Sequence, residues 1–550
     1  MFSELNNSDL LIIGGYFLII FAVALYLFLQ ELSGKKDSES SDYFLGGRSL
    51  SWVVIGASLF ASNIGSEHLV GLAGSGASGD FAASQFEILA AIIIIVLGWL
   101  FVPLYMRSGV FTMPEFLEKR YNKWARKYLS WLSIIAYILT KISVTIAAGG
   151  IIFTTLLGID FWTGAIIIVV LTGLYTIIGG LKVVAYTDFV QLIVLLGGAI
   201  AATLYGIDEI GGWEVMVERV SPEHLSLWRP MADPKFPWTG IILGAPILGV
   251  WYWCTDQFIV QRVLAAKNID HARKGTIFAS YLKLLPLFIF VLPGVVAYAL
   301  SIGDNPALTF PVEEGKTQFD AALPALTMQI LPHGLKGLVV AGLLAALMSS
   351  LSSVFNSCST LITIDLYKES KPKASEKELV SVGRIATVIL VVLGLAWIPF
   401  LRMIDGGLFQ KLQSIQAYIS PPIAAVFLFG IFSKRLTAKG AKWSLLTGAF
   451  LGVARLTLEI WNEILKEHND QLPGLLNSFA TLNFLHFAFV LFIICSLVLF
   501  AVSRSGSLIP VANIENIIYS RDKRIPLTPL QLVLTLGSFA GVVALWIIFK

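Results

Sequence analysis

The sequence predicts an all-α integral membrane protein with fourteen transmembrane helices. Of its 550 residues, 56% are hydrophobic and only 14% are charged, whereas about 25% of residues are charged in soluble proteins. The apolar residues recur in uncharged stretches of about 20, a length that crosses a bilayer as a helix. Lys and Arg gather in alternate loops, as is typical of the cytoplasmic side of a membrane protein. We therefore exclude a soluble enzyme and expect one polytopic membrane domain over 1–550.

Each expected span is an apolar stretch between polar or turn-forming segments. The first lies at 10–29, within an N-terminal segment 9–30, and has neither the basic flank nor the cleavage site of a signal peptide. The others are expected at 51–75, 82–105, 129–156, 162–180, 187–208, 240–260, 276–300, 335–364, 380–400, 413–432, 441–461, 480–503 and 529–549. Basic loops follow the first, third, seventh, ninth, eleventh and thirteenth spans, so we expect them in the cytoplasm and both termini outside it.

Charge and cysteine content narrow the range of partners. The formal net charge of +3, from 39 basic and 36 acidic residues, is too small to indicate a nucleic acid. Cys254, Cys358 and Cys495 lie in apolar stretches without a CxxC pair, so neither a metal cluster nor a disulfide framework is expected. We expect no cofactor, no enzymatic activity and no obligate protein partner. The expected partners are the lipid bilayer and small solutes.

The second span carries polar residues in its middle, which are costly inside a bilayer. It reads GASLFASNIGSEHLVGLAGSG and contains Ser62, Asn63, Glu67 and His68 among several glycines. Such a helix is expected to be interrupted, and carbonyls freed by a break can ligate a cation where they line a cavity. The alternative is that the glycines only allow close packing between helices.

The ninth span carries hydroxyl groups along one face. The polar residues that recur there at helical spacing are Ser349, Ser352, Ser353, Asn356 and Thr360. Hydroxyl and carbonyl oxygens suit a hard monovalent cation, whereas imidazole and thiolate suit transition metals. Packing of small residues between helices is again the alternative.

Ionisable and aromatic residues inside other spans indicate a polar solute. Glu87, Lys141 and Lys283 each lie within a span and need a partner or water. Tyr252 lies between two tryptophans, close to Asp256. Aromatic faces stack on sugar rings, while amides, carboxylates and amines exchange hydrogen bonds with sugar hydroxyls. Alternatively, these aromatic residues form a belt at the membrane interface.

Two prolines at 421 and 422 predict a second interruption, in the eleventh span. Interrupted spans early and late in a chain are typical of transporters built from inverted repeats. No repeat is visible when the two halves of the sequence are compared directly.

Several long motifs resemble the solute:sodium symporter family, and within it the sodium/glucose cotransporters. They include GASLFASNIGSEHLVGLAGSG, VWYWCTDQFIVQRVLAAKNI and AALMSSLSSVFNSCSTLITIDLYK, in the family's order, and the resemblance runs from about 42 to 455. It implies a LeuT-like core of two inverted five-helix repeats, at 50–208 and 240–433. The segment 9–30 would be an extra span before this core, and 440–550 would hold three spans after it.

The resemblance also implies a sugar site, an outer gate and one or two sodium sites. The sugar site would comprise Asn63, His68, Glu87, Tyr252, Trp253, Lys283 and Gln413. The outer gate would comprise Leu72, Phe86 and Phe409. One Na⁺ site would use the carbonyls of Ala61, Ile64 and Ala346 with the hydroxyls of Ser349 and Ser350. A possible second Na⁺ site would use Asp188, Ser349, Ser352 and Ser353, although Asp188 could instead cap the start of the sixth span.

The expected function is sodium-coupled import of a glucose- or galactose-type monosaccharide by alternating access, with Na⁺ as the coupling ion. Glu67 beside His68, and the stretch VQRVLAAKNI, resemble relatives that transport myo-inositol. A myo-inositol or other polyol symporter is therefore the alternative, and a sugar sensor on the same scaffold is another. The lack of long extracellular insertions and of paired cysteines favours a bacterial plasma membrane.

Overall fold

The computed structural model describes residues 5–34, 40–313, 315–401, 408–467 and 472–550. Their secondary structure is helical except for one short antiparallel hairpin of β1 (Val312–Glu313) and β2 (Lys316–Thr317). The prediction of an all-α protein with many apolar helices is therefore confirmed.

The α-helices follow one another along the whole described chain. The α-helices of the first half are α1 (Asn7–Gly34), α2 (Ser40–Leu45), α3 (Trp52–Asn63), α4 (Ser66–Ala77), α5 (Gln85–Val96), α6 (Val102–Ser108), α7 (Met113–Arg120), α8 (Lys123–Ala136), α9 (Ser143–Ile151), α10 (Phe161–Glu209), α11 (Trp213–Arg219), α12 (Trp238–Leu243), α13 (Ala245–Gly249) and α14 (Gln257–Leu264). Those of the second half are α15 (Ile269–Leu282), α16 (Leu292–Ser301), α17 (Ala322–Gln329), α18 (Leu335–Thr360), α19 (Lys368–Ser370), α20 (Glu376–Leu401), α21 (Leu408–Phe432), α22 (Ala438–Glu467), α23 (Gly474–Thr481), α24 (Phe484–Ser503), α25 (Val511–Ile514) and α26 (Pro529–Ile548).

Short π- and 3₁₀-helical segments join several of these helices. The π-helical segments are η3 (Leu97–Phe101), η4 (Tyr137–Ile142), η5 (Ile152–Leu156), η7 (Val250–Thr255), η8 (Leu287–Val291) and η10 (Leu361–Tyr367). The 3₁₀ segments are η1 (Gly46–Arg48), η2 (Phe81–Ser84), η6 (Pro222–Leu225), η9 (Phe319–Ala321) and η11 (Arg521–Lys523). Insertions of π-helix commonly occur at functional sites. Here η4 and η7 both border the cavity described below.

Within the described residues, eleven helices are long and apolar enough to cross a membrane, or twelve if one bent pair counts as a span. One of the eleven is α10, whose 49 residues would extend about 75 Å, well over the ~30 Å of a bilayer core. Gly180 interrupts it with φ 55° and ψ −157°. On either side of Gly180, Tyr175 donates a hydrogen bond to the Met348 carbonyl (3.1 Å) and Asp188 accepts one from Ser349 (2.6 Å). Both halves of α10 therefore pass α18 at one level, and the chain reverses at Gly180.

The second span is broken, as the sequence predicts. α3 ends at Asn63 and α4 begins at Ser66, and the two halves are bent by 60°. The glycines of this span also pack closely, because a Cβ at Gly76 would collide with the Val291 carbonyl of η8. A Cβ at Gly294 would collide with Ala73 of α4 in the same way. Interruption and close packing, the two interpretations of the sequence, therefore both hold.

The predicted interruption at Pro421 and Pro422 is wrong, because α21 continues through both prolines. A membrane helix can retain proline where neighbouring helices accommodate the ring and the unpaired backbone. Here the Pro422 ring packs against Gly448 of α22, which has no side chain to obstruct it.

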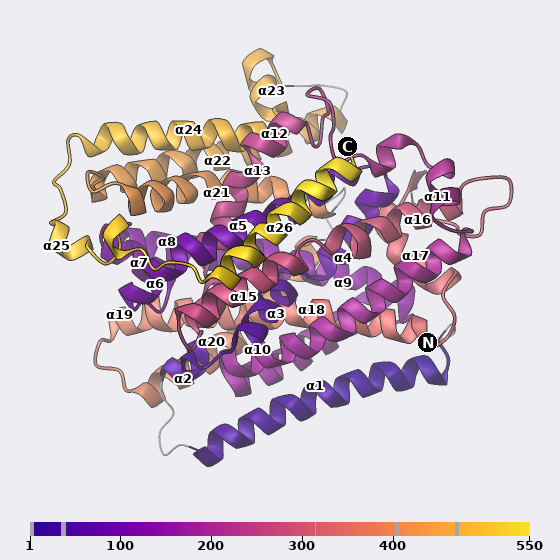
Figure 1. Ribbon diagram of the computed structural model, residues 1–550, viewed down its shortest axis with the longest axis horizontal. Helices are drawn as coiled ribbons and strands as arrows, with labels where there is room; N and C mark the ends of the chain where they lie inside the picture. The colour runs from indigo at the N-terminus through magenta and orange to yellow at the C-terminus, as the bar shows by residue number, and fades with distance from the viewer. Residues whose placement is uncertain (1–4, 35–39, 314, 402–407, 468–471) are drawn as a thin grey trace.

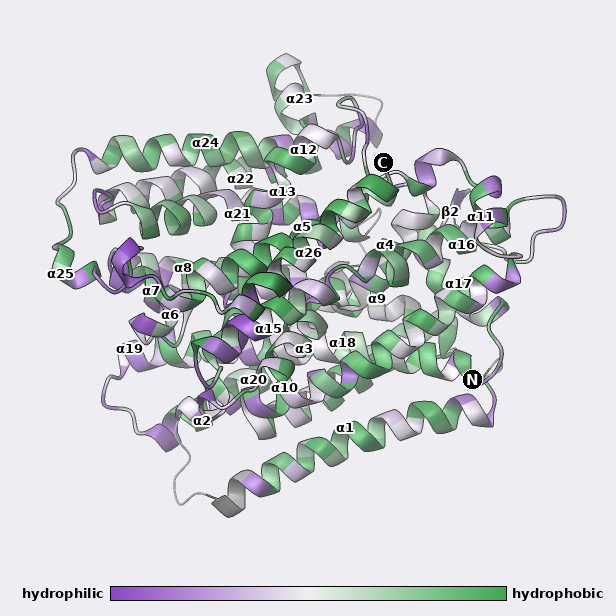
Figure 2. Ribbon diagram, in the orientation of Figure 1, coloured by the Kyte–Doolittle hydropathy of each residue, from purple (hydrophilic) through white to green (hydrophobic). Residues whose placement is uncertain are grey.

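The arrangement of the helices separates two polar ends of an apolar body. In Figure 1, α1 runs along one edge of the molecule and α24 along the opposite edge, while α26 crosses the face toward the viewer. Figure 2 shows apolar residues along the long helices and polar residues gathered near α6, α7, α19 and α25. That end holds several of the basic loops that the sequence places on one side of the membrane.

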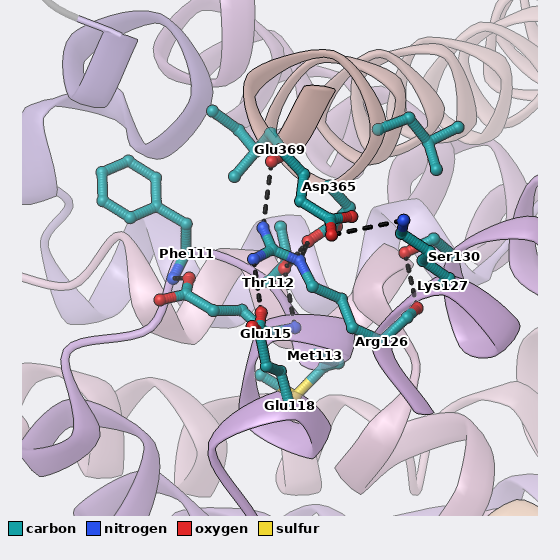
Figure 3. A network of polar contacts seen from close by, with 12 residues as sticks. Phe111, Thr112, Met113, Glu115, Glu118, Arg126, Lys127, Ser130, Asp365 and Glu369 are labelled. Carbon is teal, nitrogen blue, oxygen red and sulfur yellow. Dashed lines mark hydrogen bonds and ion pairs between the residues drawn. The ribbon is translucent and has the colours of Figure 1, made fainter. Parts of the chain in front are cut away.

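A network of charged residues fixes the connecting helix α7 to the end of η10 (Figure 3). Arg126 pairs with Asp365 (Nε–Oδ1 2.7 Å) and with Glu118 (Nη1–Oε2 2.6 Å). The Thr112 hydroxyl donates to the same Asp365 oxygen at 2.8 Å. Because Asp365 is fully buried, its charge depends on these partners.

The opposite side of α7 is held by Arg120. Its guanidinium donates to the carbonyls of Gly430 (2.7 Å) and Ser433 (2.7 Å) at the end of α21, and to Leu436 just beyond it. These carbonyls would otherwise lack partners at the end of a helix. α7 therefore connects η10 and α21 at the basic end of the bundle.

We expect the substitution Arg126→Met to lower the midpoint of thermal unfolding by several degrees. Breaking a buried ion pair commonly costs about 3–5 kcal/mol, since the remaining charge loses its compensation. Fluorescence-detected unfolding in detergent would measure the change. Lys127→Met is the matched control. Lys127 pairs with Glu369 at 3.3 Å, but its side chain is 58% exposed, so its loss should change the unfolding midpoint little.

Candidate functional site

A cavity lies where the broken second span faces the broken segment of α12, α13, η7 and α14. α12 gives way to α13 at Gly244, whose backbone stays in the helical region, and the segment is interrupted at Asp256, where the backbone is extended. The cavity is also bordered by α5, η4, α9, α18 and α21. The empty space between its walls and in its open mouth, part of it open to solvent, amounts to about 710 Å³.

The structure brings together the residues that were assigned to the sugar site from the sequence. Those that line the cavity are Asn63, His68, Glu87, Tyr252, Trp253 and Gln413. Lys283 does not line it, but lies directly behind two of them. Its ammonium group donates hydrogen bonds to Asn63 Oδ1 and Glu87 Oε2.

Lys283 and Asn63 hold the polar wall of the cavity in place. Lys283 is fully buried, and its ion pair with Glu87 compensates its charge. The Asn63 oxygen accepts from Lys283, and its amide donates to the Tyr252 hydroxyl at 3.0 Å. This orientation links both broken segments through one side chain. His68 Nε2 lies 3.9 Å from Glu87 Oε1.

A second buried ion pair forms the cavity wall near η4. Lys141 Nζ lies 2.6 Å from Asp256 Oδ2, and the Tyr137 hydroxyl donates to the other carboxylate oxygen. The ammonium also lies 3.8 Å from the ring centre of Phe258 and 4.6 Å from that of Tyr252. Cation–π contacts of this kind strengthen where water is excluded.

The cavity is also lined by residues outside the predicted sugar site, among them the polar side chains of Lys141, Thr145 and Gln416. The sequence does indicate a role for Lys141, because an ionisable residue in the middle of a span requires a partner. Asp256 is that partner. Gln416 lies one helical turn after Gln413, which indicates a position near the site, whereas Thr145 has no comparable feature because such residues also occur in ordinary helix packing.

Of the predicted outer gate, Phe86 lines the cavity and Phe409 packs against it. The Phe409 ring packs edge-on against Phe86 (5.9 Å between ring centres) and against His68 (5.8 Å). Leu72 is fully buried on α4, beside Gly71, whose Cα faces Phe409. Aromatic contacts therefore cover the polar wall at His68.

The two helices that carry the first predicted sodium site, α3 and α18, are in contact at the break of the second span. Because α3 ends at Asn63, the carbonyls of its last turn, including that of Ala61, lose their intrahelical partners. The Ser350 hydroxyl donates to the Ser62 carbonyl at 3.2 Å, which fixes α18 beside this break. Ile64, Ala346 and Ser349, the other residues assigned to this site, are all buried.

The residues of the second predicted sodium site are only partly in contact with one another. Ser349 donates to Asp188 Oδ1 at 2.6 Å, whereas the Ser352 hydroxyl bonds the Ser349 carbonyl of its own helix (3.0 Å). Ser353 reaches Asp188 only through Ser62, at 2.9 Å between hydroxyl oxygens. Ser62 and Ser58 also donate to Asp188, at 3.1 and 2.6 Å. Neither of these α3 serines was predicted in this cluster.

The alternative role for Asp188, a helix cap, does not fit the structure. Asp188 lies inside the second half of α10, eight residues beyond Gly180. Its carboxylate accepts hydroxyl groups from α3 and α18. The aspartate therefore joins three helices at a fully buried point.

Comparison with known proteins gives one family and consistent relatives. The family model "Sodium:solute symporter family" matches residues 43–448. Sodium/glucose cotransporter 1 of Oryctolagus cuniculus is 40% identical, over 95% of this chain and 83% of that protein. The Sodium/myo-inositol cotransporter of Homo sapiens is 41% identical, over 83% of this chain and 68% of that protein.

A solved structure shares the fold. A Na⁺-coupled sialic acid symporter in a substrate-bound outward-open state aligns with a TM-score of 0.73 at 20% sequence identity. The alignment covers 92% of this chain and 99% of that one. At this identity the likeness establishes the fold alone.

The geometry of the polar wall predicts energetic coupling between Lys283 and Glu87. Lys283→Ala and Glu87→Ala should each lower the thermal unfolding midpoint, because each leaves a buried charge without its partner. The double variant should lose less than the two single variants combined, since neither uncompensated charge remains. The thermal unfolding midpoints of the wild type, both single variants and the double variant are compared in detergent without added solute. If the double variant loses as much as the two single variants combined, the coupling is contradicted.

Proposed function

Because the chain belongs to the sodium:solute symporter family, we propose that it imports a monosaccharide of the glucose or galactose type with sodium. The family membership establishes a sodium-coupled solute symporter, with Na⁺ and a small solute as its cargo. The observation that carries the sugar assignment is the polar wall of the cavity beside an aromatic cluster. Amide, imidazole and carboxylate groups can exchange hydrogen bonds with several hydroxyls, and aromatic rings can stack on a sugar ring.

In this proposal each cavity residue has a distinct role. Asn63, His68, Glu87 and Gln413 exchange hydrogen bonds with the sugar hydroxyls. Tyr252 and Trp253 supply the aromatic surface, and Tyr252 closes the path toward the cytoplasm. Lys283 orients Asn63 and Glu87 from behind, as its contacts with both support. The outer gate of Leu72, Phe86 and Phe409 separates bound sugar from the outside.

Sodium binding would prepare this site. The first ion is held by the carbonyls of Ala61, Ile64 and Ala346 and the hydroxyls of Ser349 and Ser350. An ion here joins α18 to the break of the second span, and Asn63 of the sugar site lies at that same break. Sodium therefore favours the state that binds sugar, and only a difference in affinity between two states can shift their populations. Exchange between outward- and inward-open states then moves both cargoes inward.

We propose the following architecture for this cycle. The chain has fourteen spans, because the reversal in α10 gives two and the broken segment from α12 to α14 adds one. Its LeuT-like core consists of inverted repeats at 50–208 and 240–433, an arrangement that the fold match supports. The protein lies in the plasma membrane with both termini outside, and its basic loops face the cytoplasm.

Myo-inositol is the second candidate substrate. A human sodium/myo-inositol cotransporter is as similar in sequence as the glucose cotransporters. Glu67 beside His68 also resembles that branch. A cyclic polyol presents a ring of hydroxyls without a ring oxygen, so the same wall could bind it.

Purified protein in liposomes should accumulate labelled galactose or glucose when a sodium gradient is directed inward. Excess unlabelled sugar should abolish the accumulation, and an equal potassium gradient should not support it. If labelled myo-inositol accumulates and neither sugar is transported, the substrate is a polyol and not a glucose- or galactose-type sugar. Binding of sugar without uptake under any gradient would indicate a sensor.

Ser350→Ala should raise the sodium concentration needed for half-maximal uptake by about tenfold or more, since a hydroxyl ligand worth roughly 1.4 kcal/mol is lost. Sugar affinity at fixed low sodium should fall as well. Ser359→Ala is the matched control on the same helix, because its hydroxyl bonds the Gly383 carbonyl instead. Unchanged sodium dependence in S350A would remove Ser350 from the sodium site.

The number of sodium ions per cycle determines how strongly sugar can be concentrated. At 100 mV and a tenfold gradient, each ion supplies about 3.7 kcal/mol. Two ions support roughly 10⁵-fold accumulation and one supports several hundred-fold. The second ion is assigned to Asp188, Ser349, Ser352 and Ser353. Asp188→Asn should therefore reduce the charge moved per sugar from two to one, as measured by the reversal potential of sugar-dependent current.

A further inference from the structure

Arg262 on α14 is a buried charge that the proposed sugar and sodium sites leave without a role. Its side chain is fully buried, Nε donates to the Ser62 hydroxyl at 3.0 Å, and Nη1 donates to the Phe258 carbonyl. Nη2 is buried and makes no hydrogen bond to any described residue. Because burial of a guanidinium is costly, its charge must be compensated by a nearby anion.

Asp188 is the available anion. The acidic groups that face Arg262 are Asp188 and Asp256, and Asp256 already forms its ion pair with Lys141. The Asp188 carboxylate, by contrast, accepts hydrogen bonds from three serine hydroxyls. One of these belongs to Ser62, which also accepts from Arg262. The Arg262 guanidinium and the Asp188 carboxylate are therefore both hydrogen-bonded to the same hydroxyl group.

Ser62 is the junction between this pair and both proposed sodium sites. Its hydroxyl contacts Arg262, Asp188 and Ser353, and its carbonyl accepts from Ser350 of the first site. A hydroxyl oxygen has two lone pairs. Because the Ser62 proton goes to Asp188, Arg262 and the Ser353 hydroxyl occupy both lone pairs. A sodium ion beside Asp188 and Ser353 therefore competes with the guanidinium for this oxygen and for the negative charge.

We propose that Arg262 is a positioning residue that weakens sodium binding at Asp188 and makes it depend on where α14 lies. α14 begins directly after the break at Asp256, and the preceding segment η7 carries Tyr252 into the cavity. Movement of α14 that withdraws Arg262 from Ser62 exposes the full charge of Asp188, and sodium binds more tightly. By linkage, bound sodium favours that position of α14 to the same extent. This inference rests on the second sodium site of the proposed function.

Equilibrium binding of radioactive sodium to the purified full-length protein tests the proposal, with and without galactose. Without galactose, Arg262→Gln should increase sodium affinity about tenfold, because a unit positive charge near the site is removed. Galactose should change sodium affinity less in R262Q than in the wild type. The gain should disappear in R262Q that also carries D188N. Arg262→Lys keeps the charge and should stay much closer to the wild type.

Arg126→Gln is the matched control. It also removes an arginine paired with a buried aspartate, but the partners of Arg126 are Glu118 and Asp365 at the basic end of the bundle. It should leave sodium affinity unchanged. Sodium affinity that is unchanged or weaker in folded R262Q would overturn the proposal.

If R262Q does not fold, Ser62→Ala gives the deciding measurement. It removes the hydroxyl between the two charges, so the effect of galactose on sodium affinity should be lost. If galactose changes the sodium affinity of S62A as much as it changes that of the wild type, the proposal is overturned. Wild-type protein that binds sodium but imports neither sugar nor polyol would refute the proposed substrate while leaving the role of Arg262 open to these same measurements.

Discussion

The break in the second span at Ile64 and Gly65 is the constraint on which the rest of the structure depends. In a hydrocarbon environment, backbone groups outside a helix must find partners within the protein. The Ser62 carbonyl at the break contacts α18, and the Asn63 side chain contacts η7. The Ser62 hydroxyl contacts both α10 and α14. One interruption therefore brings cation ligands, the cavity wall and a buried carboxylate to the same depth.

Charge compensation determines how polar this interior can be. Lys283 pairs with Glu87, and Lys141 pairs with Asp256. Each lysine thus adds no net charge while leaving hydrogen-bonding groups at the cavity. Arg262 differs, because its compensation passes through the hydroxyl of Ser62. Direct pairs give fixed walls, whereas an indirect pair is more easily altered by an added cation.

Much of this arrangement could be predicted from the sequence. The break at Asn63 followed from polar residues and glycines inside one span, and the serine face of α18 followed from helical spacing. The partner of Lys141 could not be predicted, since Asp256 lies 115 residues away and meets it only in the folded bundle. The interruption predicted at Pro421 and Pro422 was wrong for a similar reason. The space for the Pro422 ring is supplied by Gly448 on another helix, which is not visible in the sequence around the prolines. Arg262 follows the expected seventh span and looks like an ordinary basic loop residue.

The reversal within α10 has a consequence for how the protein is made. The two halves are joined at Gly180 without an intervening loop, so neither half can be released into the bilayer with a long tether between them. Residues 161–209 are therefore expected to leave the translocation channel together, as a helical hairpin. The orientation of the first half then dictates that of the second, and in the orientation proposed above Lys182, just beyond the turn, favours a cytoplasmic position for the turn. Membrane insertion of Asp188 would thus be completed before α18, which carries Ser349, has been synthesised.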